Sequence, residues 1–159
     1  HTRFRNVTGV QTCALPISAG GASADATRLI GVDGKSLRVL VVEDNGILAL
    51  DFSMKLEDFG AEVVGCAATA VDAIRLAQKH RPDVVLMDIA LRGKETGIDA
   101  YHTIRVTSEM PIIFVTGNDN PETLGKVRDI AEFEVLLKPV EPETLRKAVF
   151  EAVRGRQRH

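Results

Sequence analysis

Short apolar runs alternate with helically spaced segments along this chain. Four runs are rich in branched residues and show little alternation of apolar and polar positions, at 37–42, 84–87, 111–115 and 134–137, and a further one covers 61–66. Such runs are typical of strands buried on both faces. Between the first two strands, Leu48, Phe52 and Leu56 recur at helical spacing. The alternation of strand and helix predicts a parallel sheet.

Helix start signals agree with this pattern. Thr69 with Asp72 and Thr96 with Asp99 resemble capping boxes, and 120–122 places an asparagine cap before a first-turn proline and an acid. The last helix is predicted from about 142 to 153. We therefore expect a single α/β domain, a doubly wound parallel sheet built from five strand-helix units.

Polar side chains stand where four of the predicted strands end. Glu43 and Asp44 follow the first strand, and Asp88, Thr116 and Lys138 end or follow three others. In an open parallel sheet, ligands bind at the carboxyl ends of the strands. The sequence therefore predicts one site that contains all of these groups.

The chemistry of this predicted site follows from its charges. Three acids brought together repel one another unless a cation lies among them, and oxygen ligands suit Mg²⁺. Asp88 would keep one oxygen free to attack phosphorus, with an aspartyl phosphate as the product. Lys138 would pair with a phosphate oxygen and Thr116 would donate its hydroxyl.

These residues resemble the receiver domain of two-component response regulators over about 37–153. The resemblance implies a flavodoxin-like fold with strand order 2-1-3-4-5, a Mg²⁺ ligand from the backbone carbonyl of Ala90, and a cis bond before Pro139. The segments 111–118 and 88–93 resemble those of the FAT GUY receivers of alphaproteobacterial signalling. Typical receivers have Tyr or Phe three residues before the lysine, but this chain has Val135, so an aromatic switch is not expected.

The function implied by the resemblance is phosphorylation-controlled signalling in the bacterial cytoplasm. A sensor histidine kinase or a histidine phosphotransfer protein would donate a phosphoryl group to Asp88, and Thr116 and Lys138 would reposition around it. The face of the last two helices and the strand between them would then engage a downstream protein. The chain would catalyse only its own phosphorylation and dephosphorylation, either as a free-standing receiver or as the carboxyl-terminal receiver of a hybrid kinase.

Other interpretations of the same residues remain open at this stage. Glu43 and Asp44 would serve equally well to cap the following helix, and Thr-Gly or Lys-Pro after a strand is common in turns. A metal-dependent phosphohydrolase would use a strand-end aspartate, but such enzymes normally carry a second acid where this chain has Ala90. A nucleotide or flavin binder of the same fold would need a glycine-rich loop in place of 43–46.

The two ends of the chain are expected to lie outside the receiver domain at 37–154. Residues 7–17 resemble the translation of a common sequencing adapter, so we interpret 1–18 as a non-native leader and expect the natural chain to begin further upstream. Residues 19–36, rich in Gly, Ala and Ser, are predicted to be a flexible linker, and 155–159 a basic tail.

Charge and hydropathy exclude some partners. The formal net charge is −2, and leaving out 1–18 removes two arginines and no acid. An acidic domain with so short a basic tail is not expected to bind nucleic acid. No apolar stretch is long enough for a membrane span.

Overall fold

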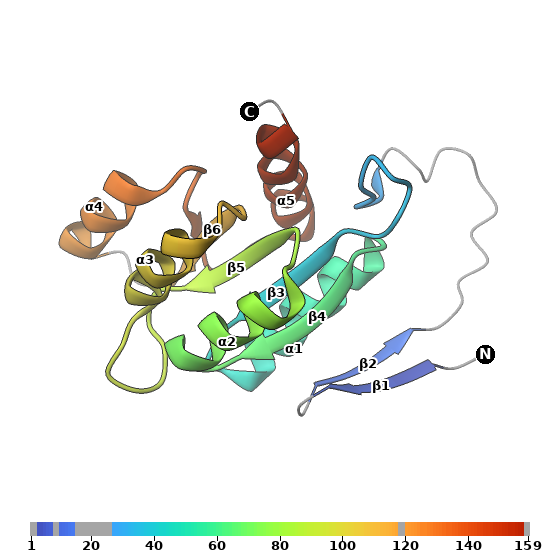
Figure 1. The fold of residues 1–159 in the computed structure, drawn as a ribbon, viewed down its shortest axis with the longest axis horizontal. Helices are drawn as coiled ribbons and strands as arrows, with labels where there is room; N and C mark the ends of the chain where they lie inside the picture. The colour runs from blue at the N-terminus through green and yellow to red at the C-terminus, as the bar shows by residue number, and fades with distance from the viewer. Residues whose placement is uncertain (1–2, 8–9, 15–26, 118–119, 158–159) are drawn as a thin grey trace.

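The computed structural model describes residues 3–7, 10–14, 27–117 and 120–157. Its central element is a five-stranded sheet with the spatial order β4-β3-β5-β6-β7, all pairs parallel (Figure 1). Counted along the chain within this sheet, the order is 2-1-3-4-5, so the predicted flavodoxin-like fold is confirmed. The elements of this domain are β3 (Arg38–Val42), α1 (Gly46–Asp58), β4 (Glu62–Ala67), α2 (Ala70–His80), β5 (Val84–Asp88), α3 (Gly97–Thr107), β6 (Ile112–Thr116), α4 (Pro121–Ile130), β7 (Leu136–Leu137) and α5 (Pro142–Gln157).

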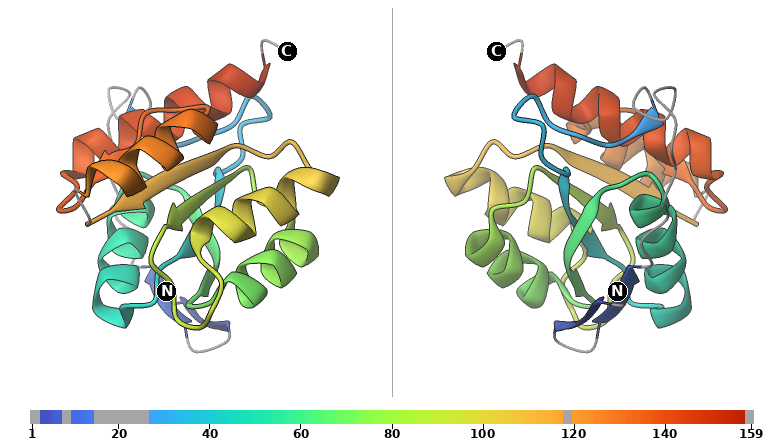
Figure 2. Two further views of the ribbon diagram at one scale, coloured as in Figure 1. Left: turned by 90° about the vertical axis from the view of Figure 1, so that its left-hand side faces the viewer. Right: turned by 90° about the vertical axis from the view of Figure 1, so that its right-hand side faces the viewer.

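The sheet is buried on both faces because its apolar residues alternate between two cores. In β3, Val39 and Val41 pack with α1 and α5, whereas Leu40 and Val42 pack with α2, α3 and α4. The strands β5 and β6 divide their side chains in the same way. Figure 2 shows the helices on either side of the sheet. Uninterrupted apolar strands are the sequence signature of such double coverage.

The predicted helix caps are largely present. Thr96 and Asp99 form a complete capping box at the start of α3. The hydroxyl of Thr69 accepts a hydrogen bond from the backbone N–H of Asp72, and the side chain of Asn120 accepts one from the N–H of Glu122. These caps fix where α2, α3 and α4 begin after the carboxyl ends of the strands.

Part of the segment for which we expected a flexible linker packs on the domain. Leu29 is fully buried in the core beside α1 and α5, and its N–H donates to the carbonyl of Phe59. A bridge between Ile30 and Ser36 closes the segment into a turn. The sequence signal was weak, because a lone leucine among small residues shows no periodicity.

The amino-terminal residues form a separate two-stranded antiparallel sheet of β1 (Arg3–Val7) and β2 (Val10–Ala14). The sequence interpretation included no strand there. The foreign origin of 1–18 stays a prediction, and its remaining residues, like 19–26 of the predicted linker and the last two residues of the basic tail, lie outside the described ones. No helix in the described part of the chain combines the length and the apolar character needed to cross a membrane.

Candidate functional site

The predicted site residues come together at the carboxyl edge of the sheet. Glu43 and Asp44 directly follow β3, and Asp88 is the last residue of β5. The strand β6 ends with Thr116, and Lys138 follows β7. Four of the five strands therefore deliver a polar group to one edge, as the strand-end pattern predicted.

Lys138 lies between two of the acids. Its Nζ donates to Oε1 of Glu43 at 2.5 Å and to Oδ2 of Asp88 at 2.8 Å. The side chains of Glu43 and Asp88 are only 1% and 6% exposed, and that of Lys138 is 16% exposed. Removing these charges from water is favourable only because they pair with one another.

Backbone contacts hold Lys138 and Asp88 in place. The N–H of Lys138 donates to the carbonyl of Thr116 at 2.9 Å, and the bond before Pro139 is cis, as predicted. Oδ1 of Asp88 accepts from the N–H of Ala90 at 3.2 Å. The role of the Ala90 carbonyl as a metal ligand stays a prediction.

Three carboxylates form a cluster at this edge. Glu43, Asp44 and Asp88 each offer an oxygen, and these atoms all lie within 4.8 Å of one another. The first helix is capped by Asn45, whose side chain accepts from the N–H groups of Ile47 and Leu48. The two acids after β3 therefore do not cap α1, and the alternative that they serve only as helix caps is not supported.

The cluster has one buried oxygen without a partner. Oε2 of Glu43 is inaccessible to solvent and makes no hydrogen bond in the described part of the chain. An unpaired buried carboxylate oxygen costs free energy unless it meets a cation or a donor. The cluster offers three hard oxygen donors, and Mg²⁺ prefers ligands of this kind.

Burial and mutual repulsion shift the protonation of this cluster. Burial raises the pKa of the Glu43 carboxyl to about 7, and the neighbouring Asp88 acts in the same direction, while Lys138 opposes both. Burial lowers the pKa of the Lys138 ammonium, but hydrogen bonds with Asp88 and Glu43 outweigh it, so the pKa lies above its usual value. The lysine is thus held as a cation among acids that carry excess negative charge.

Thr116 is buried, and only 1% of its surface is exposed. It ends β6 beside β5, where Asp88 pairs in register with Val115. Its carbonyl accepts the backbone hydrogen bond from Lys138, so Thr116 and the lysine are directly linked. Asn118, the last residue of the segment that resembles FAT GUY receivers, lies outside the described residues.

Gly97 supports Asp88 and was missed by the sequence interpretation. It begins α3, and its N–H donates to the carbonyl of Ile89 at 2.8 Å. A β-carbon built on Gly97 would lie 2.0 Å from the carbonyl oxygen of Asp88, closer than any side chain can approach. A glycine directly after the capping threonine was the available signal, since glycine permits close backbone approach.

Comparison with known proteins identifies the family. A model of the response regulator receiver domain matches residues 39–150, which is more than half of the chain. The chain belongs to this family. Its receiver fold agrees with the solved signal receiver domain of a modulated diguanylate cyclase from Desulfovibrio desulfuricans, with a TM-score of 0.73 and 31% identity, covering 77% of this chain and 98% of that one. The PhyR response regulator from Brucella abortus gives a TM-score of 0.68 at 30% identity, covering 86% of this chain and 54% of PhyR.

Related receivers occur in proteins of different length. The transcriptional regulatory protein PdtaR of Mycobacterium tuberculosis is 33% identical over 116 residues, or 73% of this chain and 56% of PdtaR. The protein PilH of Pseudomonas aeruginosa is 33% identical over 123 residues, or 74% of this chain and 98% of PilH. The chain thus spans about half the length of some relatives, including PdtaR and the regulator PhyR of Methylorubrum extorquens, and nearly all of others.

Proposed function

We propose that this receiver accepts a phosphoryl group on Asp88 in a two-component phosphorelay. The observation that carries the proposal is the position of the Asp88 carboxylate, 2.8 Å from Lys138 Nζ and within the same cluster as Glu43 and Asp44. A buried carboxylate beside a cation and a metal-type acid pair is arranged for attack on the phosphorus of a negatively charged phosphoryl group.

Mg²⁺ would be held by Glu43, Asp44, Asp88 and the backbone carbonyl of Ala90. When bound, it would neutralise charge on the incoming phosphoryl group. The unpaired Oε2 of Glu43 and its raised pKa support a cation at this place, because a cation would satisfy that oxygen and favour its ionised form.

The transfer step uses groups that the structure brings together. A carboxylate oxygen of Asp88 would form the new bond to phosphorus while the P–N bond of a phosphohistidine breaks and the histidine leaves with the bonding electrons. Lys138 would exchange one of its carboxylate partners for an oxygen of the transferred group, and the Thr116 hydroxyl would donate to another. Transfer to water would later restore Asp88.

The partners follow from this step. The donor would be a sensor histidine kinase or a histidine phosphotransfer protein, which places the chain in the cytoplasm. Because Lys138 follows β7 and is tied to Thr116, a shift of either residue would reach the face formed by α4, β7 and α5. We propose that this face, where the edge residue Leu137 is 50% exposed, engages a downstream protein rather than nucleic acid.

The test is the intact mass of the protein after incubation with Mg²⁺ and acetyl phosphate. The parent should gain one phosphoryl group, and neither Asp88→Asn nor the parent in EDTA should gain any. Asp51→Asn, which removes a carboxylate from the exposed face of α1, is the matched control and should label like the parent. Equal labelling of Asp88→Asn, or labelling that survives removal of divalent metal, would contradict the proposal.

A phosphohydrolase is not supported by the site. Such an enzyme would place a second acid two residues after the nucleophile, and Ala90 offers no side-chain oxygen there. Release of inorganic phosphate from phosphate esters is therefore not expected.

A further inference from the structure

A pocket lies at the end of the domain where α2, α3 and α5 terminate. It is a hollow open to solvent with a volume of about 460 Å³, a size found among small-ligand sites. The buried side chains of Ala77, Ile104 and Met110 form its apolar part. Its other lining residues are polar or lie at the rim, namely Gln78, Arg81, Pro82, Thr107, Ser108 and Arg156.

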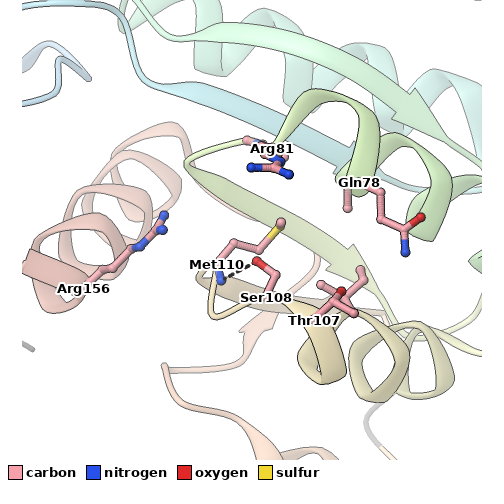
Figure 3. A pocket seen from close by; sticks show the side chains of 9 residues that line it. Gln78, Arg81, Thr107, Ser108, Met110 and Arg156 are labelled. Atoms are coloured by element: carbon pink, nitrogen blue, oxygen red, sulfur yellow. Dashed lines mark hydrogen bonds between the residues drawn. The ribbon is translucent and has the colours of Figure 1, made fainter.

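Two arginines from distant parts of the chain converge on this pocket. In Figure 3, Arg156 reaches toward the hollow from α5, and Arg81 lies across it from Ser108 and Met110. No lining residue is acidic. Neither guanidinium makes a hydrogen bond or ion pair with a residue that the structure describes, whereas Arg75, Arg105 and Arg146 each pair with a carboxylate.

The usual structural role of such arginines is already filled by others. Cations near helix ends commonly bond the last carbonyls. Here the carbonyls of His80 and Arg81 accept from Arg38, and those of Ser108 and Met110 accept from Arg105. Arg81 is therefore not needed as a cap, and the carbonyls that would repel an anion are occupied. Arg156 lies in the last turn of α5, where a cation also interacts favourably with the helix dipole.

The backbone at Arg81 is strained. Arg81 adopts a left-handed conformation with φ of 44°, and it is the only residue other than glycine with positive φ in the described part of the chain. It follows α2 at the position where glycine is usual, since a β-carbon is strained there. Strained backbone of this kind is often found at functional sites.

Hydroxyl and amide groups add donors to the pocket. The Oγ of Ser108 accepts from the N–H of Met110 at 3.2 Å, which leaves its own hydrogen available to a ligand. Thr107 and Gln78 lie on the same rim.

We infer that this pocket binds a small organic phosphate, with the phosphate group between Arg81 and Arg156 and a flat apolar body against Met110 and Ile104. Guanidinium groups pair with phosphate through two parallel hydrogen bonds, which explains two convergent arginines without acids. The site lies at the opposite end of the sheet from Asp88, so it acts apart from the proposed phosphoacceptor.

The experiment is an NMR titration of the isotope-labelled chain with adenosine 5′-monophosphate in EDTA, which keeps phosphate from a metal at the other end. Saturable shifts of the Ser108 and Met110 amides are expected. Inorganic phosphate should bind more weakly and adenosine should cause no saturable shift, since each lacks one half of the ligand. Absence of saturation at about 10 mM nucleotide, or shifts confined to the Asp88 end, would overturn the inference.

Variants separate binding from folding. Arg81→Gly removes the guanidinium but relieves the left-handed strain, so it should fold at least as well as the parent while losing about tenfold or more in affinity. Arg156→Ala should lose a similar factor. Arg75→Ala removes one positive charge from a paired arginine on α2 and should stay within about twofold of the parent. Unchanged affinity in Arg81→Gly would rule the site out.

Discussion

At the carboxyl end of the central sheet, Glu43 and Asp88 are buried and share one lysine, whereas at the opposite end Arg81 and Arg156 are exposed and unpaired among the described residues. The carboxyl end gathers three acids around one lysine, whereas the pocket at the opposite end is lined by two arginines and no acid. Only the buried charges must be neutralised internally, because exposed guanidinium groups keep their hydration. We therefore expect the stability of the acidic end to depend on metal and protonation, and the basic end to tolerate substitution with little loss of stability.

The largest expected contrast comes from removing one cation at each end. Lys138→Met, measured at pH 8 in EDTA, should lower the free energy of unfolding by about 3 kcal/mol, because two buried carboxylates lose their shared partner. Arg156→Ala should change it by less than about 0.5 kcal/mol. Urea unfolding of both variants measures the difference, and equal costs would remove the distinction between the two ends.

A second prediction concerns the close packing at the acidic end. Gly97→Ala should cost about 2–3 kcal/mol and slow the labelling of Asp88, because the new methyl group displaces the backbone carbonyl of that residue. The control is Gly125→Ala within α4, where a β-carbon meets nothing within 4 Å. That variant should gain up to about 1 kcal/mol from helix propensity. Denaturant titrations of both variants measure these changes. An unchanged free energy of unfolding in Gly97→Ala would show that α3 can move away from the site.

Protonation of Glu43 gives a third test in the metal-free protein. Its pKa rises from 4.5 to about 7 in the folded chain, so the folded state binds the proton more tightly than the unfolded state does. The proton therefore adds to the free energy of unfolding at low pH, and this stabilisation is lost as the pH rises through about 7. Between pH 5 and pH 8, the free energy of unfolding of Glu43→Gln relative to that of the parent should therefore rise by about 2 kcal/mol. Thermal unfolding across this range measures it. Mg²⁺ at pH 8 should favour the parent over the variant, and parallel pH profiles would contradict the raised pKa.

The last prediction is at the basic end, where the expected effect is small and stabilising. Arg81→Gly should raise the free energy of unfolding by about 0.5–1 kcal/mol, since glycine adopts the observed φ of 44° without strain. Chemical unfolding of this variant against the parent is the measurement. A loss of stability would mean that the arginine side chain holds the end of α2 in place.

Much of the acidic end could be predicted from sequence because a parallel sheet has a simple geometry. Once four apolar runs are identified as strands, the residue after each run must lie at one edge, and this places Glu43, Asp88, Thr116 and Lys138 together. The strand near 134–137 was predicted too long, since the sheet edge pairs only Leu136 and Leu137 with β6. Short edge strands are one way in which proteins limit pairing with other chains.

The sequence by itself determined the order of the elements, the double burial of the strands and which polar residues form the cluster around Lys138, because periodicity and strand ends are local patterns. Only the tertiary structure decided that Leu29 enters the core, that Gly97 touches the backbone of Asp88, and that Arg81 and Arg156 share a pocket. Each of these depends on packing between segments far apart in the chain. The angles and distances at which such segments pack are not encoded in a repeating pattern of residues.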